Sequence, residues 1–110
     1  MVRSKSEKII ADLLYRKGIP YHYEPELILR DGTKIYPDFA VLNLKHRKTI
    51  YWEHLGMMED PEYSEKAVRK ISAYIKNGIF PGEQLILTAE TKEFPVNVRE
   101  VKILIQHYLQ

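Results

Sequence analysis

The chain has 110 residues, 45% of them hydrophobic and 29% charged, which is typical of one globular domain over residues 1–110 and leaves no room for a second. It contains no cysteine, which excludes disulfides and thiolate metal sites and fits a cytoplasmic protein. The net charge of +2 is too small for a protein that coats DNA. No apolar run approaches the roughly 20 residues that span a bilayer, so we expect no membrane partner.

The first predicted element is a helix over residues 5–17, because apolar residues recur there at helical spacing. Gly18 and the proline two residues later end it. Ser4 fits the N-cap position, and Glu7, three residues on, fits the second position of a capping box. The charged residues before this helix lead into no long apolar stretch, so we expect no signal peptide.

Three strands are predicted next, over residues 21–29, 34–42 and 48–55, since these segments are rich in aromatic and β-branched residues. The pair 31–32, an Asp-Gly, is a tight-turn signal between the first two strands. Pro37 indicates an irregular or edge position in the second strand. The short links between these strands predict an antiparallel meander.

The second half of the chain alternates helix and strand. Asp60 and Pro61 open a helix that ends at the Asn-Gly pair 77–78. A short buried strand follows over residues 84–88, and a final helix over 97–109. The order αβββαβα predicts an α/β fold with a central mixed sheet of about four strands, flanked by helices.

Two acidic residues, Asp38 and Glu53, stand fifteen residues apart, each inside an otherwise apolar and aromatic strand. Losing water costs an unpaired charge several kcal/mol, so such positions rarely carry one. If the two carboxylates face each other, one takes a proton unless a cation lies between them, and a hard divalent ion fits oxygen ligands. Alternatively, Asp38 begins a turn and Glu53 pairs with a nearby lysine.

The element order, the Pro37–Asp38 pair in the second strand and Glu53 in the third resemble the PD-(D/E)XK, or restriction-endonuclease-like, nuclease superfamily over nearly the whole chain. The resemblance implies a nuclease that hydrolyses DNA, in a repair, restriction or phage-related context, with RNA not excluded. It implies that Asp38, Glu53 and the backbone carbonyl of His54 bind Mg²⁺, for which Mn²⁺ can substitute. It also implies that Glu7 contacts the ion through water, a role compatible with the capping box.

The family pattern ends in a lysine two residues after the glutamate, where this chain has Leu55. One explanation is that the lysine has moved to the second helix, where Lys70, four residues before Tyr74, resembles a motif of helicase-associated nucleases, with Lys66 as a second candidate. Another is that His54 contributes. A third is that the chain kept the fold and lost catalysis, in which case Lys70 is an ordinary solvated helix residue.

Two rival functions stay open besides the nuclease. The first is an inactive nuclease-fold module that binds nucleic acid or protein, and the second is a small interaction domain unrelated to nucleic acid. The chain has no obvious target-recognition region, so we expect a homodimer or a piece of a larger helicase or repair protein. Five residues near the end of the third strand fit either a base-stacking surface or the core: Trp52, His54, Met57, Met58 and Tyr63.

Overall fold

Helices and strands follow one another in nearly the order that the sequence predicts. In the computed structural model, residues 4–110 are described, and the first three residues of the predicted 1–110 domain lie outside this range. The elements in chain order are α1 (Lys5–Arg16), β1 (Tyr21–Tyr23), β2 (Leu27–Ile28), β3 (Lys34–Ile35), β4 (Phe39–Asn43), β5 (Lys48–Leu55), α2 (Pro61–Lys76), β6 (Leu85–Ala89) and α3 (Val98–Leu109).

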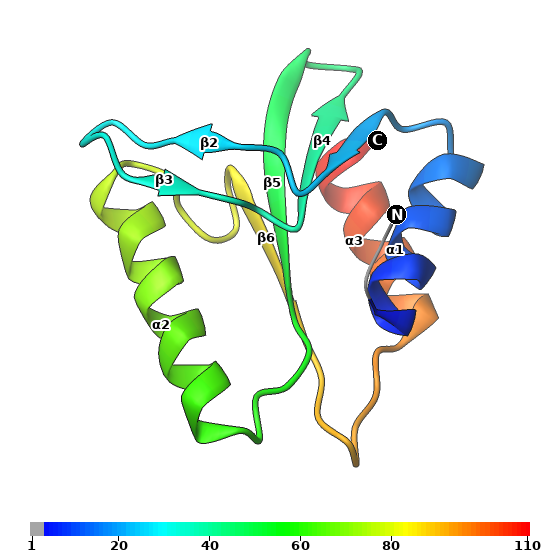
Figure 1. The fold of residues 1–110 in the computed structure, drawn as a ribbon. Helices are drawn as coiled ribbons and strands as arrows, with labels where there is room; N and C mark the ends of the chain where they lie inside the picture. The colour runs from blue at the N-terminus through cyan, green and yellow to red at the C-terminus, as the bar shows by residue number, and fades with distance from the viewer. Residues whose placement is uncertain (1–3) are drawn as a thin grey trace.

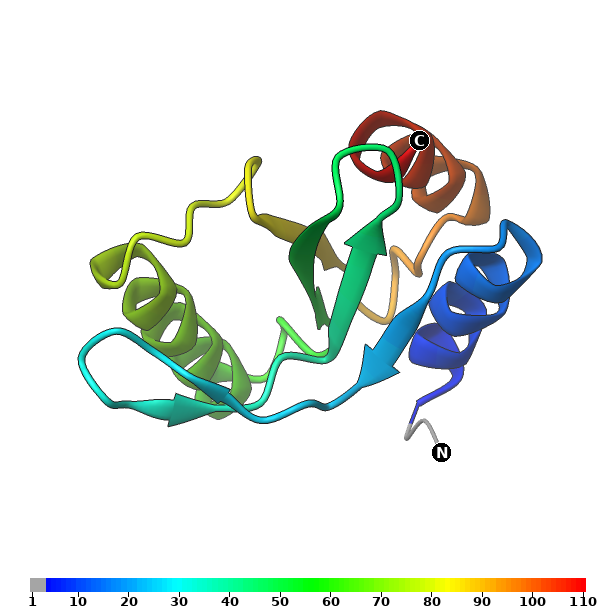
Figure 2. The same ribbon diagram turned by 90° about the horizontal axis from the view of Figure 1, so that it is seen from above.

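The central sheet has the strand order β1-β4-β5-β6 among the described residues. β4 pairs antiparallel with β1 and with β5, whereas β6 pairs parallel with β5. The sheet is therefore mixed, as predicted. Helices α1 and α3 cover one face, and α2 lies beside the other (Figures 1 and 2). None of the helices within residues 4–110 has both the length and the apolar character needed to cross a membrane.

The predicted strands 21–29 and 34–42 are each broken in two, and this corrects the three-strand meander. Glu24 adopts a left-handed conformation with φ of 49° and is followed by a proline, which ends β1. Pro37 lacks an N–H donor and separates β3 from β4. The second half of the first predicted strand, β2, and the first half of the next, β3, form a separate antiparallel pair. We call residues 27–35 the arm.

The arm reaches across to the C-terminal end of α2 (Figure 1). Its turn uses Gly32 at φ of 90°, as the Asp-Gly signal predicts. At the tip, the backbone N–H of Asp31 donates to Oδ1 of Asn77 at 2.9 Å, and Nδ2 of Asn77 donates to Oδ2 of Asp31 at 3.3 Å. Asn77 is buried, so the helix end predicted at 77–78 also holds the arm in place.

Glu7, the second residue of the predicted capping box, links α1 to β1. Oγ of Ser4 accepts a hydrogen bond from the backbone N–H of Glu7 at 3.1 Å, which confirms the cap. The carboxylate of Glu7 accepts a hydrogen bond from the hydroxyl of Tyr23 at 2.7 Å. This contact turns Glu7 toward the sheet.

The hydrophobic core lies between the sheet and the α1–α3 pair. Trp52 is fully buried in it, between residues of α1 and α3. Since side chains alternate along a strand, Tyr51, Glu53 and Leu55 point to the opposite face, where the ring of Tyr51 lies 6.5 Å from that of Tyr74 on α2. Of the two alternatives for Trp52, a base-stacking surface and the core, the structure realises the core.

Candidate active site

Asp38 and Glu53 meet where β4 begins. Phe39 pairs with Trp52, so the next step of the same antiparallel register places Asp38 opposite Glu53 on the α2 face. Oδ2 of Asp38 accepts a hydrogen bond from the backbone N–H of His54 at 2.7 Å. Glu53 is 3% exposed. The placement of the two acids on one sheet face agrees with the prediction, whereas Asp38 continues into a strand and does not open a turn.

Lys70 and Tyr74, one turn apart on α2, both contact the buried carboxylate of Glu53. Nζ of Lys70 lies 3.0 Å from Oε1 and 2.9 Å from Oε2 of Glu53, and it also donates to the backbone carbonyl of Tyr36 at 2.7 Å. The hydroxyl of Tyr74 donates to Oε2 of Glu53. Lys70 is thus directed into the site, and its interpretation as a solvated surface lysine is wrong. The alternative pairing of Glu53 with a nearby lysine is also realised.

The site holds more negative charge than its residues neutralise. Burial and the charge of Glu53 raise the pKa of Asp38 to about 7, and Glu7 adds to this effect. The hydrogen bond from the His54 backbone and the charge of Lys70 work in the other direction. The result is that Asp38 takes up a proton near neutral pH unless another cation approaches.

A cavity of about 230 Å³ opens beside these groups, between β5 and α2. Leu55, two residues after Glu53, forms an apolar part of its wall. Lys70 reaches the cavity from α2, and Lys66 lies one helical turn before it. The cavity is lined by Asp38, Glu53, Leu55, Tyr63, Lys66, Ala67 and Lys70.

The backbone carbonyl of His54 faces the same region. The hydroxyl of Tyr63 donates to this carbonyl at 3.3 Å and accepts a hydrogen bond from the backbone N–H of Gly56 at 3.0 Å. Burial raises the pKa of Tyr63, and the charges of nearby acids, including Glu7, add to the shift. Sequence reasoning did not assign this contact to Tyr63, because nothing local links a helix residue to the strand carbonyl before it.

The imidazole of His54 points away from the acids, into the α1–α3 face. Nδ1 lies 2.8 Å from Oγ1 of Thr88, and Nε2 lies 2.7 Å from Oε1 of Glu90. Burial works to raise the pKa of Glu90, but hydrogen bonds from Ser6, His54 and the Val96 backbone hold it below its usual value. The expectation that the His54 side chain replaces the missing lysine is therefore wrong. The Glu90 partner was missed, because 36 residues separate it from His54.

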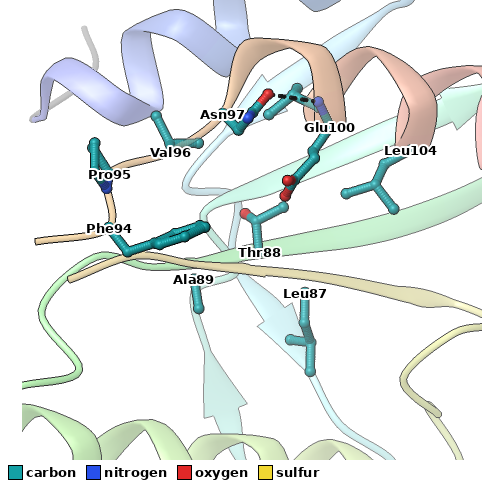
Figure 3. Close-up of a pocket in the computed structure, with 10 residues that line it drawn as sticks. Leu87, Thr88, Ala89, Phe94, Pro95, Val96, Asn97, Glu100 and Leu104 are labelled. Atoms are coloured by element: carbon teal, nitrogen blue, oxygen red, sulfur yellow. Dashed lines mark hydrogen bonds between the residues drawn. The ribbon is translucent and has the colours of Figure 1, made fainter.

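A second pocket, of about 180 Å³, lies between β6 and the start of α3 (Figure 3). Asn97 in this pocket is the N-cap of α3, because its Oδ1 accepts a hydrogen bond from the backbone N–H of Glu100 at 3.1 Å. Glu100 is the sole carboxylate among its lining residues, and no cation faces it there. This pocket therefore lacks the paired acids and the lysine that the Asp38 cavity combines.

The donor set at Asp38 and Glu53 suits some metal ions better than others. Within residues 4–110, no cluster of three or more histidine, aspartate or glutamate side chains is suited to hold an ion, so the three or four protein ligands that zinc requires are not assembled. Mg²⁺ keeps several waters and needs one or two carboxylates. Two facing acids and one backbone carbonyl therefore fit Mg²⁺, and Glu7 is not gathered into the group.

The chain matches no protein-family model. An uncharacterised protein of Methanocaldococcus jannaschii is 42% identical to it over 80 residues, which are 70% of this chain and 6% of that protein. The shared stretch is thus a small part of a much longer relative.

Two solved structures align with most of the chain. The DrdV–DNA complex aligns with 91% of this chain and 10% of its own, with 14% identity and a TM-score of 0.52. The MunI restriction endonuclease, in complex with cognate DNA, aligns with 92% of this chain and 82% of its own at 17% identity, but its TM-score of 0.39 is too low to establish a shared fold. The chain therefore has a mixed α/β fold, with a four-stranded sheet flanked by helices, that is similar to a part of the DrdV structure.

Proposed function

We propose that the chain is a metal-dependent nuclease domain of the PD-(D/E)XK type that hydrolyses DNA phosphodiester bonds. The observation that carries the proposal is the convergence of Asp38, Glu53 and Lys70 in one cavity. An ion pair with a purely structural role needs only one acid. Here a second acid, Asp38, lies beside Glu53, and burial together with the charge of Glu53 raises the pKa of Asp38 to about 7. DNA is the favoured substrate because the DrdV structure of the same fold contains it.

In this proposal, Asp38, Glu53 and the backbone carbonyl of His54 hold Mg²⁺ or Mn²⁺, and Glu7 reaches it through water. A bound ion lowers the pKa of a water ligand and stabilises charge on the phosphate. Tyr74 fixes the carboxylate of Glu53 through its hydroxyl, which keeps one oxygen oriented toward the cavity.

Lys70 supplies the function that the family places two residues after the glutamate. Its Nζ lies within hydrogen-bond distance of both Glu53 oxygens, on the wall of the cavity. From there the ammonium group can orient the attacking water or donate to a phosphate oxygen that gains charge during the reaction. Lys66, exposed one turn earlier, is placed to meet a neighbouring phosphate.

The inactive-module alternative rests on Leu55, which leaves the strand without its lysine. This alternative binds nucleic acid or protein and predicts no cleavage with any metal. The match to 6% of a long relative supports a separate proposal, that this domain works within a larger protein such as a helicase or repair enzyme. A homodimer is the other possible assembly.

A nuclease assay with Mg²⁺ and with Mn²⁺ tests the proposal on supercoiled, linear duplex and single-stranded DNA and on RNA. We expect Asp38→Asn and Glu53→Gln to abolish cleavage, and Lys70→Ala to slow it by roughly 10²-fold or more. Asp12→Asn, at an exposed acid paired with Lys8 on α1, is the matched control and should cut at the wild-type rate. Wild-type protein that binds DNA but never cuts it would favour the inactive module.

A further inference from the structure

Three cations and one histidine occupy the β4–β5 turn, at the end of the sheet away from the candidate active site. Lys45, His46, Arg47 and Lys48 are consecutive and exposed, and we call residues 45–48 the basic turn. Glu53 lies five residues along β5 from Lys48, so about 17 Å separate the two at roughly 3.3 Å per residue. In Figure 1 the turn lies at the top of the molecule, beside the C-terminal end of α3.

The lysines and the arginine of the basic turn form no ion pair within the described part of the chain. Other basic residues, such as Lys8, Lys34 and Arg69, form ion pairs with nearby acids. Across residues 4–110, by contrast, no carboxylate lies within ion-pair distance of Lys45, Arg47 or Lys48. The turn therefore presents a concentrated positive charge to solvent.

A cavity of about 460 Å³ adjoins the turn, between the start of β5 and the end of α3. Lys45, His46 and Lys48 line it from the turn, and His107 lines it from α3. Glu83 is the one acid among its lining residues. The positive side chains outnumber this acid, so the cavity suits an anion.

The turn is held in a defined shape by its neighbours. Oδ1 of Asn43 accepts a hydrogen bond from the backbone N–H of His46 at 3.0 Å, and Nδ2 of Asn43 donates to the carbonyl of Tyr108 at 2.8 Å. Asn43 is buried, so these bonds tie the turn to α3. The cations are thus displayed on a fixed support.

Arg47 adopts a backbone conformation that is unfavourable for a residue with a long side chain. Its φ is 52°, in the left-handed region that favours glycine and asparagine and that strains a long side chain. A glycine or asparagine there would relax the turn but remove a charge. Strain retained at one charged residue is a reason to look for a function of that charge.

We infer that the basic turn is a second binding site for nucleic-acid phosphates, contacted by the same DNA that enters the Asp38 cavity. The inference rests on the proposed function. The Asp38 cavity lies on the α2 side of the sheet and the cavity beside the turn on the α3 side, so the turn would meet DNA where it passes the end of the sheet. A duplex carries one phosphate charge per roughly 1.7 Å of axis and therefore presents phosphates there. Such contacts carry no base information. They raise affinity and orient the duplex without touching the bond that is cut.

The test measures binding of a 20-base-pair duplex by fluorescence anisotropy over a range of salt concentrations, in EDTA so that nothing is cut. Arg47→Asn should weaken binding about 3- to 10-fold and reduce the slope of log K against log salt by about 0.9. Its unfolding midpoint should stay the same or rise, because the strain is relieved. Arg47→Lys should bind nearly as well as wild type, and Arg99→Gln, at an exposed cation at the start of α3, is the matched control.

The triple variant Lys45→Gln, Arg47→Asn, Lys48→Gln should reduce the slope by about 2 to 3. With metal present, these variants should raise KM while kcat stays near the wild-type value. Wild-type protein that never cuts, but whose turn variants bind DNA more weakly, would overturn the nuclease proposal and support this inference. An unchanged salt slope in the triple variant would overturn the inference. So would weakened binding to vesicles of anionic lipid in the triple variant with unchanged binding to DNA.

Discussion

Replacing Lys70 with methionine removes the cation that touches both oxygens of the Glu53 carboxylate while keeping a long apolar stem. Glu53 is 3% exposed in the wild type, and in this variant it keeps only Tyr74 as a side-chain donor. The negative charges of Glu53 and Asp38 then lose the one ammonium group that contacts Glu53 within residues 4–110, and only the exposed Lys66 remains on the cavity wall. The variant therefore isolates what Lys70 does for the two acids in the absence of metal.

The expected loss of stability follows from the burial of the pair. Removing one partner of a fully buried ion pair costs about 3–5 kcal/mol. The side chain of Lys70 is 31% exposed, so water screens part of the interaction, and about 2–3 kcal/mol is a better value here. For a chain of this length, this corresponds to a fall in Tm of roughly 8–12 °C.

Metal binding should change in the opposite direction. In the wild type, a divalent ion must share Glu53 with the ammonium group of Lys70, at 2.9 and 3.0 Å. Without that repulsion, Mn²⁺ affinity should rise about tenfold, which corresponds to about 1.4 kcal/mol. The assay is thermal unfolding across a Mn²⁺ titration, since an ion that binds only the folded state raises Tm.

Lys76→Met, at an exposed lysine in the last turn of α2, is the control and should alter neither quantity. Two results would refute the reasoning about Lys70. One is a metal-free Tm equal to that of wild type, which would mean that the ion pair contributes nothing in solution. The other is a Mn²⁺-dependent rise in Tm of the same size in both proteins, which would place the metal away from Glu53.

Further predictions concern the neighbours of Lys70. The pKa of Asp38, raised from 3.8 to about 7, means that the folded state holds this proton more tightly than the unfolded state, so the contribution of Asp38 to stability falls as pH rises from about 4 to 7. The free energy of unfolding of metal-free Asp38→Asn, measured with urea, should therefore be about 1–3 kcal/mol higher than that of wild type at pH 8 and equal to it near pH 4. A difference that does not depend on pH would contradict this. The same variant should lose the Mn²⁺-dependent rise in Tm, and a full response would show that the ion binds elsewhere. Tyr74→Phe removes a donor to a buried carboxylate and should cost about 2 kcal/mol in urea unfolding, whereas a change below about 0.5 kcal/mol would mean that water replaces the hydroxyl.

The parts of the site that sequence predicts are those governed by short-range geometry. Alternation along β5 sets Glu53 on the face opposite Trp52, and helical spacing sets Lys70 above Tyr74. These periodicities need no knowledge of the tertiary fold. The antiparallel link between β4 and β5 is also short, so the approach of Asp38 to Glu53 follows from local order.

The parts that sequence missed depend on distant partners or on unusual backbone. The break of the first predicted strand follows from the left-handed Glu24, a conformation that glutamate rarely adopts. The pairing of His54 with Glu90 joins residues 36 positions apart, and that of Asp31 with Asn77 joins residues 46 apart. No pattern within one element encodes such contacts. Alternation along β5 places the side chains of His54 and Glu53 on opposite faces, but the partner of the His54 imidazole, Glu90, could not be predicted for this reason.

The arm is fastened to α2 at two points, by Asp31 to Asn77 at its tip and by the carbonyl of Tyr36, just beyond its base, to Lys70. Between these points, its turn at Gly32 is exposed, and a Cβ atom added there would meet no neighbour within 4 Å. The turn is therefore a natural graft site for protein engineering. A target-recognition peptide inserted there would be carried on a braced support and would leave the metal-binding residues in place.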